Sequence, residues 1–434
     1  MQITVSKLRD ALSLLDSGVG KKKNGLPLLQ CVLLGDGVIR ATNLDRSVSL
    51  ALREADGMAP VLLQHKILQQ TLAYIPGHQV LDIQARKDGS AVDLTTDGSK
   101  LEMARAGDVS DFPPMAGPDP VIGQGSVDGD VLVPWLQAIA PYAARDNSRP
   151  VLSGVCVTLG DGPVKLAAAD GFRLGYTTLP VSFPGEAKHR LIVPVETAGA
   201  LAPLWRASAR GPGLGEGPSN VALRTVAPRL MRVAFSETQL QLRFGNVTFS
   251  TALIAGDFPD YEQLIPTGDL LEVTVFAEEF ERAVHRAAPI SEAGAEIIRL
   301  SWADGVLHVV GRSEDIGRVE ATVRAVAGGK GQGGNTAFKC GFLLSYLKGK
   351  QGLLTIRQAE PSSPASLTMA DDVSVVIMPM FVQPEEKGKP EEQSKPAAGK
   401  KPRSKPARGA KAPEAEEGQE TDPSPVAAEA AAGG

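Results

Sequence analysis

The sequence predicts an α+β protein in which one structural unit occurs three times before a disordered C-terminal tail. Six amphipathic helix candidates share a nearly constant spacing of about 60 to 85 residues, beginning at Ser6, His65, Val133, Val193, Ala277 and Cys340. Residues 32–52, 164–181 and 305–326 follow the first, third and fifth of these helices. All three segments have the same layout, in which an apolar run, a short polar loop and a second, alternating run follow one another. The repeated unit therefore contains two helices and several strands.

The helix candidates are identified by apolar residues at helical spacing. In "SKLRDALSLLDS", residues Leu8, Ala11, Leu12 and Leu15 fall on one face. The other five candidates have comparable patterns, over residues 65–75, 133–146, 193–208, 277–288 and 340–350. The segments between them are expected to be strands and turns, with Asp45, Asp170 and Asp315 in the polar loops.

Two connectors rich in Pro and Gly divide the chain. "VSDFPPMAGPDP" covers 109–120 and "AGDFPDYEQLIPTGD" covers 255–269. The predicted domains are therefore 1–121, 122–269 and 270–382.

A tail at 383–434 follows the third domain and is dominated by Pro, Ala, Gly, Lys and Glu without apolar periodicity, which predicts disorder. Its segment from Lys395 to Lys411 is basic and contains no acidic residue. Two interpretations are equally open, a solubilising spacer or a weak, salt-sensitive contact with nucleic acid.

Composition excludes several classes of protein. The chain has 434 residues and 43% hydrophobic content, but no apolar run long enough to cross a membrane and no signal peptide, so we expect a cytoplasmic protein. Its three cysteines, Cys31, Cys156 and Cys340, lack CxxC spacing and are expected to be core side chains. The five histidines show no metal-binding spacing, so we predict no metal and no cofactor. With a net charge of −5, any contact with DNA requires positive charge gathered on one face.

Four segments resemble the bacterial sliding clamp, the beta subunit of DNA polymerase III: "AAADGFRLGYTTLP", "HRLIVPVETAGAL", "GDFPDYEQLIP" and "VSVVIMPM". The similarity runs in order from residue 1 to about 382, with "GLPLLQCVLL" and "VSDFP" matching the first domain. The resemblance implies three similar domains, with sheets outside and two helices inside each. It also implies a ring of two chains around duplex DNA, with the polymerase catalytic subunit, the clamp loader and other clamp-binding proteins as partners. Such a clamp is a non-catalytic processivity factor.

Basic residues on the polar faces of the helices are the candidates for facing DNA, together with a lysine run in the loop before "NGLPLL". They are Lys7, Arg9, Lys21, Lys22, Lys23, Lys66, Arg145, Arg206, Arg210, Arg282, Arg286 and Lys348. A ring holds DNA by topology, so these contacts are expected to be loose and independent of base sequence. "GVGKKKNG" lacks the spacing of a phosphate-binding loop, and we predict no nucleotide site there.

The run "SVVIMPMFV" at 374–382 is apolar on both faces, yet Pro379 cannot donate to a sheet ladder, so strand pairing is expected to stop near it. The resemblance implies that this run forms one wall of a cleft that binds short Leu- and Phe-containing peptides, between the second and third domains. Unbranched methionines suit such a surface because they repack around different partners. The implied cleft residues are Leu152, Ala169, Gly171, Phe172, Arg173, Leu174, Pro259, Gln263, Leu264, Phe342, Ser366, Val376, Ile377, Met378, Pro379, Met380 and Phe381.

Four residues depart from the family pattern. Ala169 stands where threonine is common, Gln263 and Lys339 replace more usual residues, and Phe381 takes the place of a basic residue. The exit of the cleft should therefore be more apolar than usual.

The resemblance also implies a dimer contact. It places Leu101 and Met103 of one chain against Pro289 and Ile290 of the other, with the sheet continuing across the seam. The nearest alternative is a specialised clamp paralogue that serves repair or a plasmid. A more distant one is an enzyme of unrecognised type, although no GxSxG or HExxH signature is present.

Overall fold

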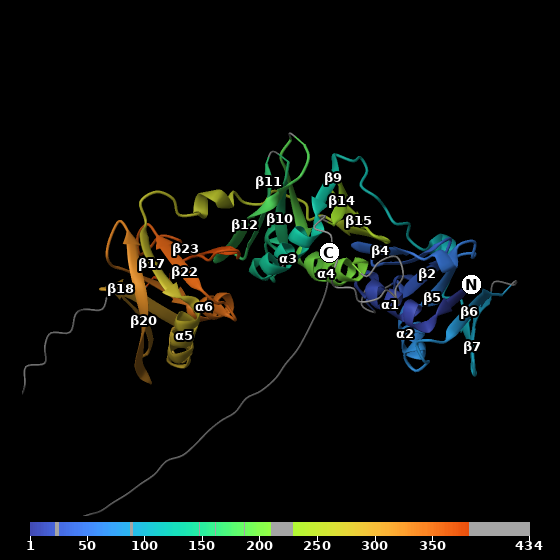
Figure 1. The fold of residues 1–434 in the computed structure, drawn as a ribbon, viewed down its shortest axis with the longest axis horizontal. Helices are drawn as coiled ribbons and strands as arrows, with labels where there is room; N and C mark the ends of the chain where they lie inside the picture. Colours follow the sequence, from blue (N-terminus) through green and yellow to red (C-terminus); the bar gives the residue numbers. More distant parts are fainter. Residues whose placement is uncertain are drawn as a thin grey trace, which may run out of the picture. The chain divides into compact units, whose positions relative to one another are not determined.

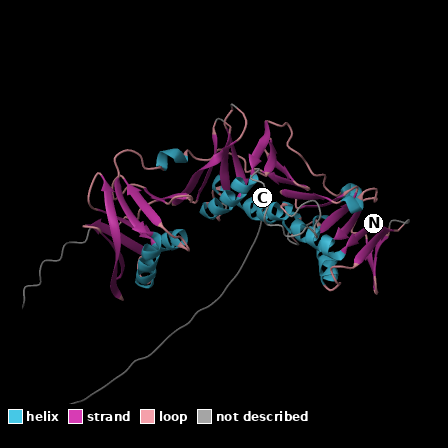
Figure 2. Ribbon diagram, in the orientation of Figure 1, coloured by secondary structure: helices cyan, strands magenta, loops and turns pink. Residues whose placement is uncertain are grey.

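A computed structural model of the protein describes residues 1–21, 26–86, 90–146, 148–160, 162–185, 187–209 and 229–381. These residues belong to one compact unit, Met1–Val382. Helices and antiparallel strands alternate along the chain, which confirms the predicted α+β class (Figure 2).

All six predicted helices form. They are α1 (Val5–Leu15), α2 (His65–Ala73), α3 (Gly129–Ile139), α4 (Val195–Ser208), α5 (Ala277–Glu292) and α6 (Cys340–Leu347). They contact one another as the consecutive pairs α1 with α2, α3 with α4 and α5 with α6 (Figure 1). The helix α3 begins four residues before the predicted start at Val133, because the Asp128 carboxylate accepts the backbone N–H of Asp130 at 2.9 Å and caps the helix there.

The strands form three sheets in which every pair is antiparallel. A four-stranded sheet has the order β1 (Gln2–Thr4), β6 (Val80–Ala85), β7 (Ala91–Thr96), β8 (Ser99–Ala104). An eight-stranded sheet has the order β5 (Val61–Gln64), β2 (Cys31–Gly35), β3 (Val38–Thr42), β4 (Arg46–Ala51), β16 (Val247–Ala252), β15 (Gln239–Phe244), β14 (Leu230–Phe235), β9 (Gly123–Asp128).

The third sheet has twelve strands. Its order is β13 (His189–Pro194), β10 (Gly154–Leu159), β11 (Pro163–Ala169), β12 (Arg173–Ser182), β24 (Ser374–Ile377), β23 (Ala365–Thr368), β22 (Leu353–Gln358), β17 (Leu271–Phe276), β20 (Gly317–Gly329), β19 (Val306–Ser313), β18 (Ile297–Ala303), β21 (Gly334–Lys339).

Two strand pairs join segments that are about 200 residues apart in the chain. β4 pairs with β16, with Val48 opposite Phe249, and β12 pairs with β24, with Leu174 opposite Val376. In both pairs, one strand directly follows a predicted polar loop: β4 follows the loop with Asp45, and β12 follows the loop with Asp170. The partner strand is β16, the last strand before the connector at 255–269, or β24, the last described strand of the chain. The main-chain ladder is therefore continuous across both places.

Asx turns position these strands. Asn43 Oδ1 accepts the N–H of Arg46 at 2.7 Å, and Asp170 Oδ1 accepts the N–H of Arg173 at 2.8 Å. The side chain that fastens the first loop thus belongs to Asn43 rather than to the predicted Asp45. The Asp45 carbonyl instead accepts the N–H of Ala252, which ties the turn to β16.

The helices pack their apolar faces on the sheets. The first helix buries Leu8, Ala11, Leu12 and Leu15, the four residues predicted from periodicity. All three cysteines are buried and free, as expected. Burial raises the pKa of both Cys156 and Cys340 to about 11, and it raises the pKa of Cys31 as well.

Candidate peptide cleft and DNA-facing residues

A tight turn at the start of β12 presents the first predicted cleft residues. Asp170 Oδ1 accepts the backbone N–H of Phe172 at 3.0 Å, and Gly171 has a φ of 91°. That backbone conformation favours glycine. The turn leaves the Phe172 side chain 60% exposed, next to the predicted final strand.

Arg173 links this turn to helix α6. The Nε and Nη2 groups of Arg173 donate hydrogen bonds to Asp170 Oδ2, at 3.0 Å and 2.9 Å. The Nη1 group of Arg173 donates to Ser345 Oγ at 2.8 Å. The guanidinium lies 4.7 Å from the ring centroid of Phe342. The Phe172 and Phe342 rings are 6.2 Å apart. These contacts fix the two aromatic rings beside each other.

The final strand lies beside the same turn. Met378 donates its N–H to the Phe172 carbonyl at 2.9 Å, just after β24 ends at Ile377. Pairing with β12 stops there, which confirms the prediction made from Pro379. Beyond the proline, Met380 donates its N–H to the carbonyl of Ala337 on β21 at 2.8 Å. The methionine-containing run is therefore held against the fold at both ends.

A hydrophobic cluster lies under these residues. Leu152, Leu174 and Val376 belong to it together with Phe258 and Tyr261, and the half-buried Ala169 packs against it. Ser366 and Ile377 are also buried. These predicted cleft residues thus lie beneath the surface, where they support the exposed members.

The exposed members form the apolar part of the candidate cleft. Phe172 is 60% exposed, Leu264 44%, Met378 40%, Met380 37% and Phe381 88%. Of these residues, Phe172 and Met378 are adjacent through a main-chain hydrogen bond, and neighbouring exposed apolar side chains are typical of a protein interaction site. Pro259 and Gln263 are exposed as well, and Gln263 donates to Asp260 Oδ2 at 2.8 Å. Two cavities described elsewhere in the chain, of about 520 Å³ and 480 Å³, include none of the predicted cleft residues.

Two residues beside the cleft escaped the sequence analysis. Ser345 lies three positions after Phe342 in α6, so helical periodicity placed it on the same face. Tyr142 lies 5.7 Å from the Arg173 guanidinium, and burial raises the pKa of its hydroxyl to about 12, which keeps the ring neutral. No local pattern marks Tyr142, because its neighbours come from β12.

The candidate DNA-facing residues differ in how available they are. Several are exposed and carry no ion pair among the described residues, namely Lys21, Lys66, Arg145, Arg206, Arg282, Arg286 and Lys348. Arg282 and Arg286 are four residues apart on the exposed face of α5. Lys22, Lys23 and Arg210 lie outside the described residues.

Lys7 and Arg9 are engaged within the protein. Lys7 Nζ forms an ion pair with Glu54 at 2.5 Å, and its side chain is only 22% exposed. Arg9 Nη1 donates to the Ala73 carbonyl at 3.4 Å. The Glu54 carboxylate offsets the charge of Lys7, so its attraction for phosphate is weaker than the sequence suggested.

The predicted dimer residues lie on β8 and at the end of α5. Leu101 and Ile290 are half-buried, Pro289 is exposed and Met103 is only 7% exposed. Met103 therefore serves the protomer core, and the predicted contact with a second chain depends chiefly on the other three. That contact stays a prediction. Lys339, one of the four residues that differ from the family pattern, forms an ion pair with Glu296 at 2.9 Å.

The described part of the chain contains no group of three or more His, Cys, Asp or Glu that could hold a metal ion. Among the same residues, no helix is long and apolar enough to cross a membrane.

Comparison with known proteins agrees with this arrangement. Residues 126–210 match the central domain of the DNA polymerase III beta subunit, and residues 262–381 match its C-terminal domain. The Pseudomonas aeruginosa protein named beta sliding clamp is 25% identical over 381 residues, covering 84% of this chain and 95% of the relative. The beta sliding clamp of Caulobacter vibrioides is 26% identical over 415 residues, covering 88% and 100%.

Solved structures share the fold. The crystal structure of the DNA polymerase III subunit beta from Pseudomonas aeruginosa aligns with a TM-score of 0.75 at 22% identity, covering 88% of this chain and 100% of that one. The beta subunit from Thermotoga maritima aligns with a TM-score of 0.72 at 21% identity, covering 88% and 99%. The fold is thus that of a sliding clamp. The two domain matches and the named relatives indicate an accessory subunit of a polymerase rather than an enzyme. The chain belongs to the family of DNA polymerase III beta subunits.

Proposed function

We propose that two copies of this chain form a ring around duplex DNA and tether the replicative polymerase to its template. Membership of the sliding-clamp family supports this proposal. Within the chain we propose three clamp domains, 1–121, 122–269 and 270–382, each with one of the helix pairs described above. The proposed compartment is the cytoplasm, where a bacterial chromosome is replicated.

Sheet continuity is the observation that carries the ring proposal. β4 and β12 follow equivalent loops and pair with β16 and β24, the last strands of the next domains. β20 follows the third equivalent loop, and β8 is the last strand of the first domain. Among the described residues, β8 pairs with β7 alone, so its outer edge is open. We propose that β8 pairs with residues 317–324 of β20 in the partner chain, which repeats both internal junctions. These residues pair with β19 on one side, and β17 pairs only with residues 325–329 of the same strand, so among the described residues their second edge is open.

The proposed contact with DNA is electrostatic and independent of sequence. Exposed basic residues on α2, α4 and α5, such as Lys66, Arg206 and Arg286, supply positive charge although the chain as a whole has a net charge of −5. Because a closed ring retains DNA by topology, these side chains only need to neutralise phosphates loosely.

The proposed peptide cleft is the apolar surface around Phe172, Leu264 and Met378. Three features support it. The surface is exposed, it is supported by a buried cluster, and Arg173 packs on the Phe342 ring, which lies beside the Phe172 ring. Its proposed ligands are short peptides with Leu and Phe anchors, carried by the polymerase catalytic subunit, the clamp loader and other clamp-binding proteins.

Retention on circular DNA tests the ring directly. The chain should be loaded on nicked circular DNA by an ATP-driven clamp loader and then washed at high salt. A ring should stay on the circle at salt concentrations that remove a charge-bound protein, and it should slide off once the circle is linearised. Equal retention on circular and linear DNA would count decisively against encirclement.

A further inference from the structure

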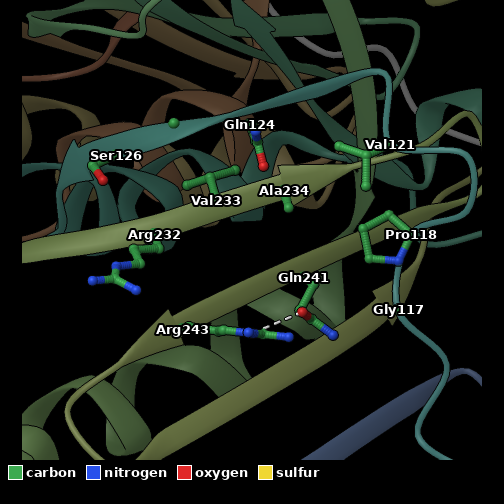
Figure 3. A pocket seen from close by; sticks show the side chains of 11 residues that line it. Gly117, Pro118, Val121, Gln124, Ser126, Arg232, Val233, Ala234, Gln241 and Arg243 are labelled. Atoms are coloured by element: carbon green, nitrogen blue, oxygen red, sulfur yellow. Dashed lines mark hydrogen bonds between the residues drawn. The ribbon is translucent and has the colours of Figure 1, made fainter.

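A cavity of about 520 Å³ lies on the eight-stranded sheet, away from the candidate cleft. Its walls come from β9, β14 and β15 and from the connector that precedes β9. Arg232 and Arg243 project from adjacent strands, while Pro118 and Val121 of the connector form an apolar side (Figure 3). The cavity has room for more than one small ion.

The lining is rich in donors and contains no carboxylate. Its polar side chains are two guanidinium groups, the Ser126 hydroxyl and the amides of Gln124 and Gln241. Arg232 and Arg243 are direct cross-strand partners, so their Cα atoms are about 4.5–5.5 Å apart. Among the described residues, neither arginine forms an ion pair. Like charges directly opposite each other destabilise a sheet, so this pair has an uncompensated electrostatic cost.

A chain of hydrogen bonds orients one of the two arginines. Arg243 Nε donates to Gln241 Oε1 at 2.9 Å, Gln241 Nε2 donates to Ser250 Oγ at 3.2 Å, and Ser250 Oγ donates to the Ala116 carbonyl at 3.2 Å. Gln241 and Ser250 are buried. This series of hydrogen bonds uses only the Nε of Arg243, so both terminal amino groups of that side chain remain available to a ligand in the cavity.

The cavity lies on the face of the sheet opposite the helices. Met231, Val233 and Phe235 alternate with Arg232 along β14 and are buried. On β15, the Phe244 ring packs against the Trp205 ring of α4, with 5.2 Å between the ring centroids, whereas the preceding Arg243 is exposed. The two arginines therefore point away from the helical face that we propose for DNA, and their role is independent of that proposal.

We propose that this cavity binds a phosphate group, either as free phosphate or as the phosphate end of a nucleotide. A phosphate dianion balances two guanidinium charges and accepts hydrogen bonds from both forks, whereas one carboxylate leaves a positive charge unmatched. The Ser126 hydroxyl, on the strand next to Arg232, adds a further donor. The apolar side at Pro118 and Val121 suits an organic group attached to the phosphate.

Calorimetric titration of the full chain tests this proposal. The probes are sodium phosphate, dATP without divalent cations, and deoxyadenosine, which lacks phosphate. We expect one binding site per chain for the phosphate-containing probes and none for deoxyadenosine. Arg232→Gln and Arg243→Gln should each weaken binding about tenfold or more, because each removes charge-assisted hydrogen bonds. The matched control is Arg190→Gln, an exposed arginine on β13 that should leave the affinity within about twofold of wild type.

The probes also identify the source of the phosphate. Tighter binding of dATP than of phosphate assigns the site to a nucleotide, and equal binding assigns it to the free anion. Thermal melting of the unliganded variants provides a second readout. Their Tm should equal or exceed that of wild type, since each substitution removes a like-charge contact. Absence of phosphate and dATP binding up to about 10 mM would overturn the proposal. So would affinities that neither substitution alters, or binding of a glutamate-rich peptide in place of phosphate.

Discussion

Replacing Phe172 by alanine should weaken peptide binding without affecting assembly of the protein. The Phe172 ring is 60% exposed in the protomer, beside Phe342 and the main chain of Met378. If the candidate cleft binds an apolar peptide, this ring is one of the surfaces that the peptide covers. The substitution removes that surface and leaves the main-chain pairing of β12 with β24 in place.

The size of the effect follows from the exposed area. A phenylalanine side chain of about 200 Å² that is 60% exposed offers about 120 Å² to a ligand. A peptide that covers half of this area removes about 60 Å² from water. At about 25 cal/mol per Å², the lost contribution is about 1.5 kcal/mol, which is about a tenfold increase in Kd. For an isolated pentapeptide we expect a wild-type Kd on the order of micromolar.

The assay is a fluorescence-anisotropy titration of a labelled pentapeptide with Leu and Phe anchors. Phe276→Ala is the matched control, because Phe276 is 48% exposed but lies at the end of β17, outside the predicted cleft. A chain ending at Val382 should bind as tightly as the full chain if the tail is a separate element. The reasoning fails if Phe172→Ala binds like wild type, or if both phenylalanine substitutions weaken binding equally.

Three other predictions concern the cleft, the seam and an internal ion pair. Met380→Ala should weaken binding of the same peptide by about 1 to 2 kcal/mol, and an unchanged titration curve would show that Met380 does not contact the peptide. Leu101→Glu combined with Ile290→Glu should yield monomers by light scattering, and a dimer mass would refute the seam. Burial works to raise the pKa of Glu54, but the hydrogen bond from Lys7 leaves it below the ordinary value of 4.5. The Tm advantage of wild type over Glu54→Gln should therefore be complete above about pH 4.5 and decline as the pH falls further, whereas a constant advantage would contradict this reasoning.

Local patterns predicted the elements of this fold well. Helical periodicity located all six helices, because each buries one apolar face against a sheet. Pro379 correctly indicated the end of strand pairing, because proline has no N–H to donate. In the turn before β12, Asp170 was already visible as a loop residue in the sequence. These features depend on residues that are close together in the chain.

Features that depend on distant residues could not be found in the same way. The pairing of β4 with β16 joins residues about 200 positions apart, and no local pattern specifies which edge meets which. The ion pair between Lys7 and Glu54 spans 47 positions, so Lys7 looked like a free surface charge in the sequence. Likewise, the cavity with Arg232 and Arg243 exists only because β14 and β15 pair in a register that places the two arginines opposite each other.

The burial of the three cysteines makes this chain a convenient background for site-specific chemistry. At neutral pH, Cys156 and Cys340 remain protonated because their pKa is about 11, and a thiol reacts far more slowly than a thiolate with alkylating reagents. Cys31 is buried too. A single cysteine introduced on an exposed strand edge should therefore be labelled selectively without removal of any native residue. Fluorophores or cross-linkers placed on β8 and β20 would then report how far apart these two edges are in solution.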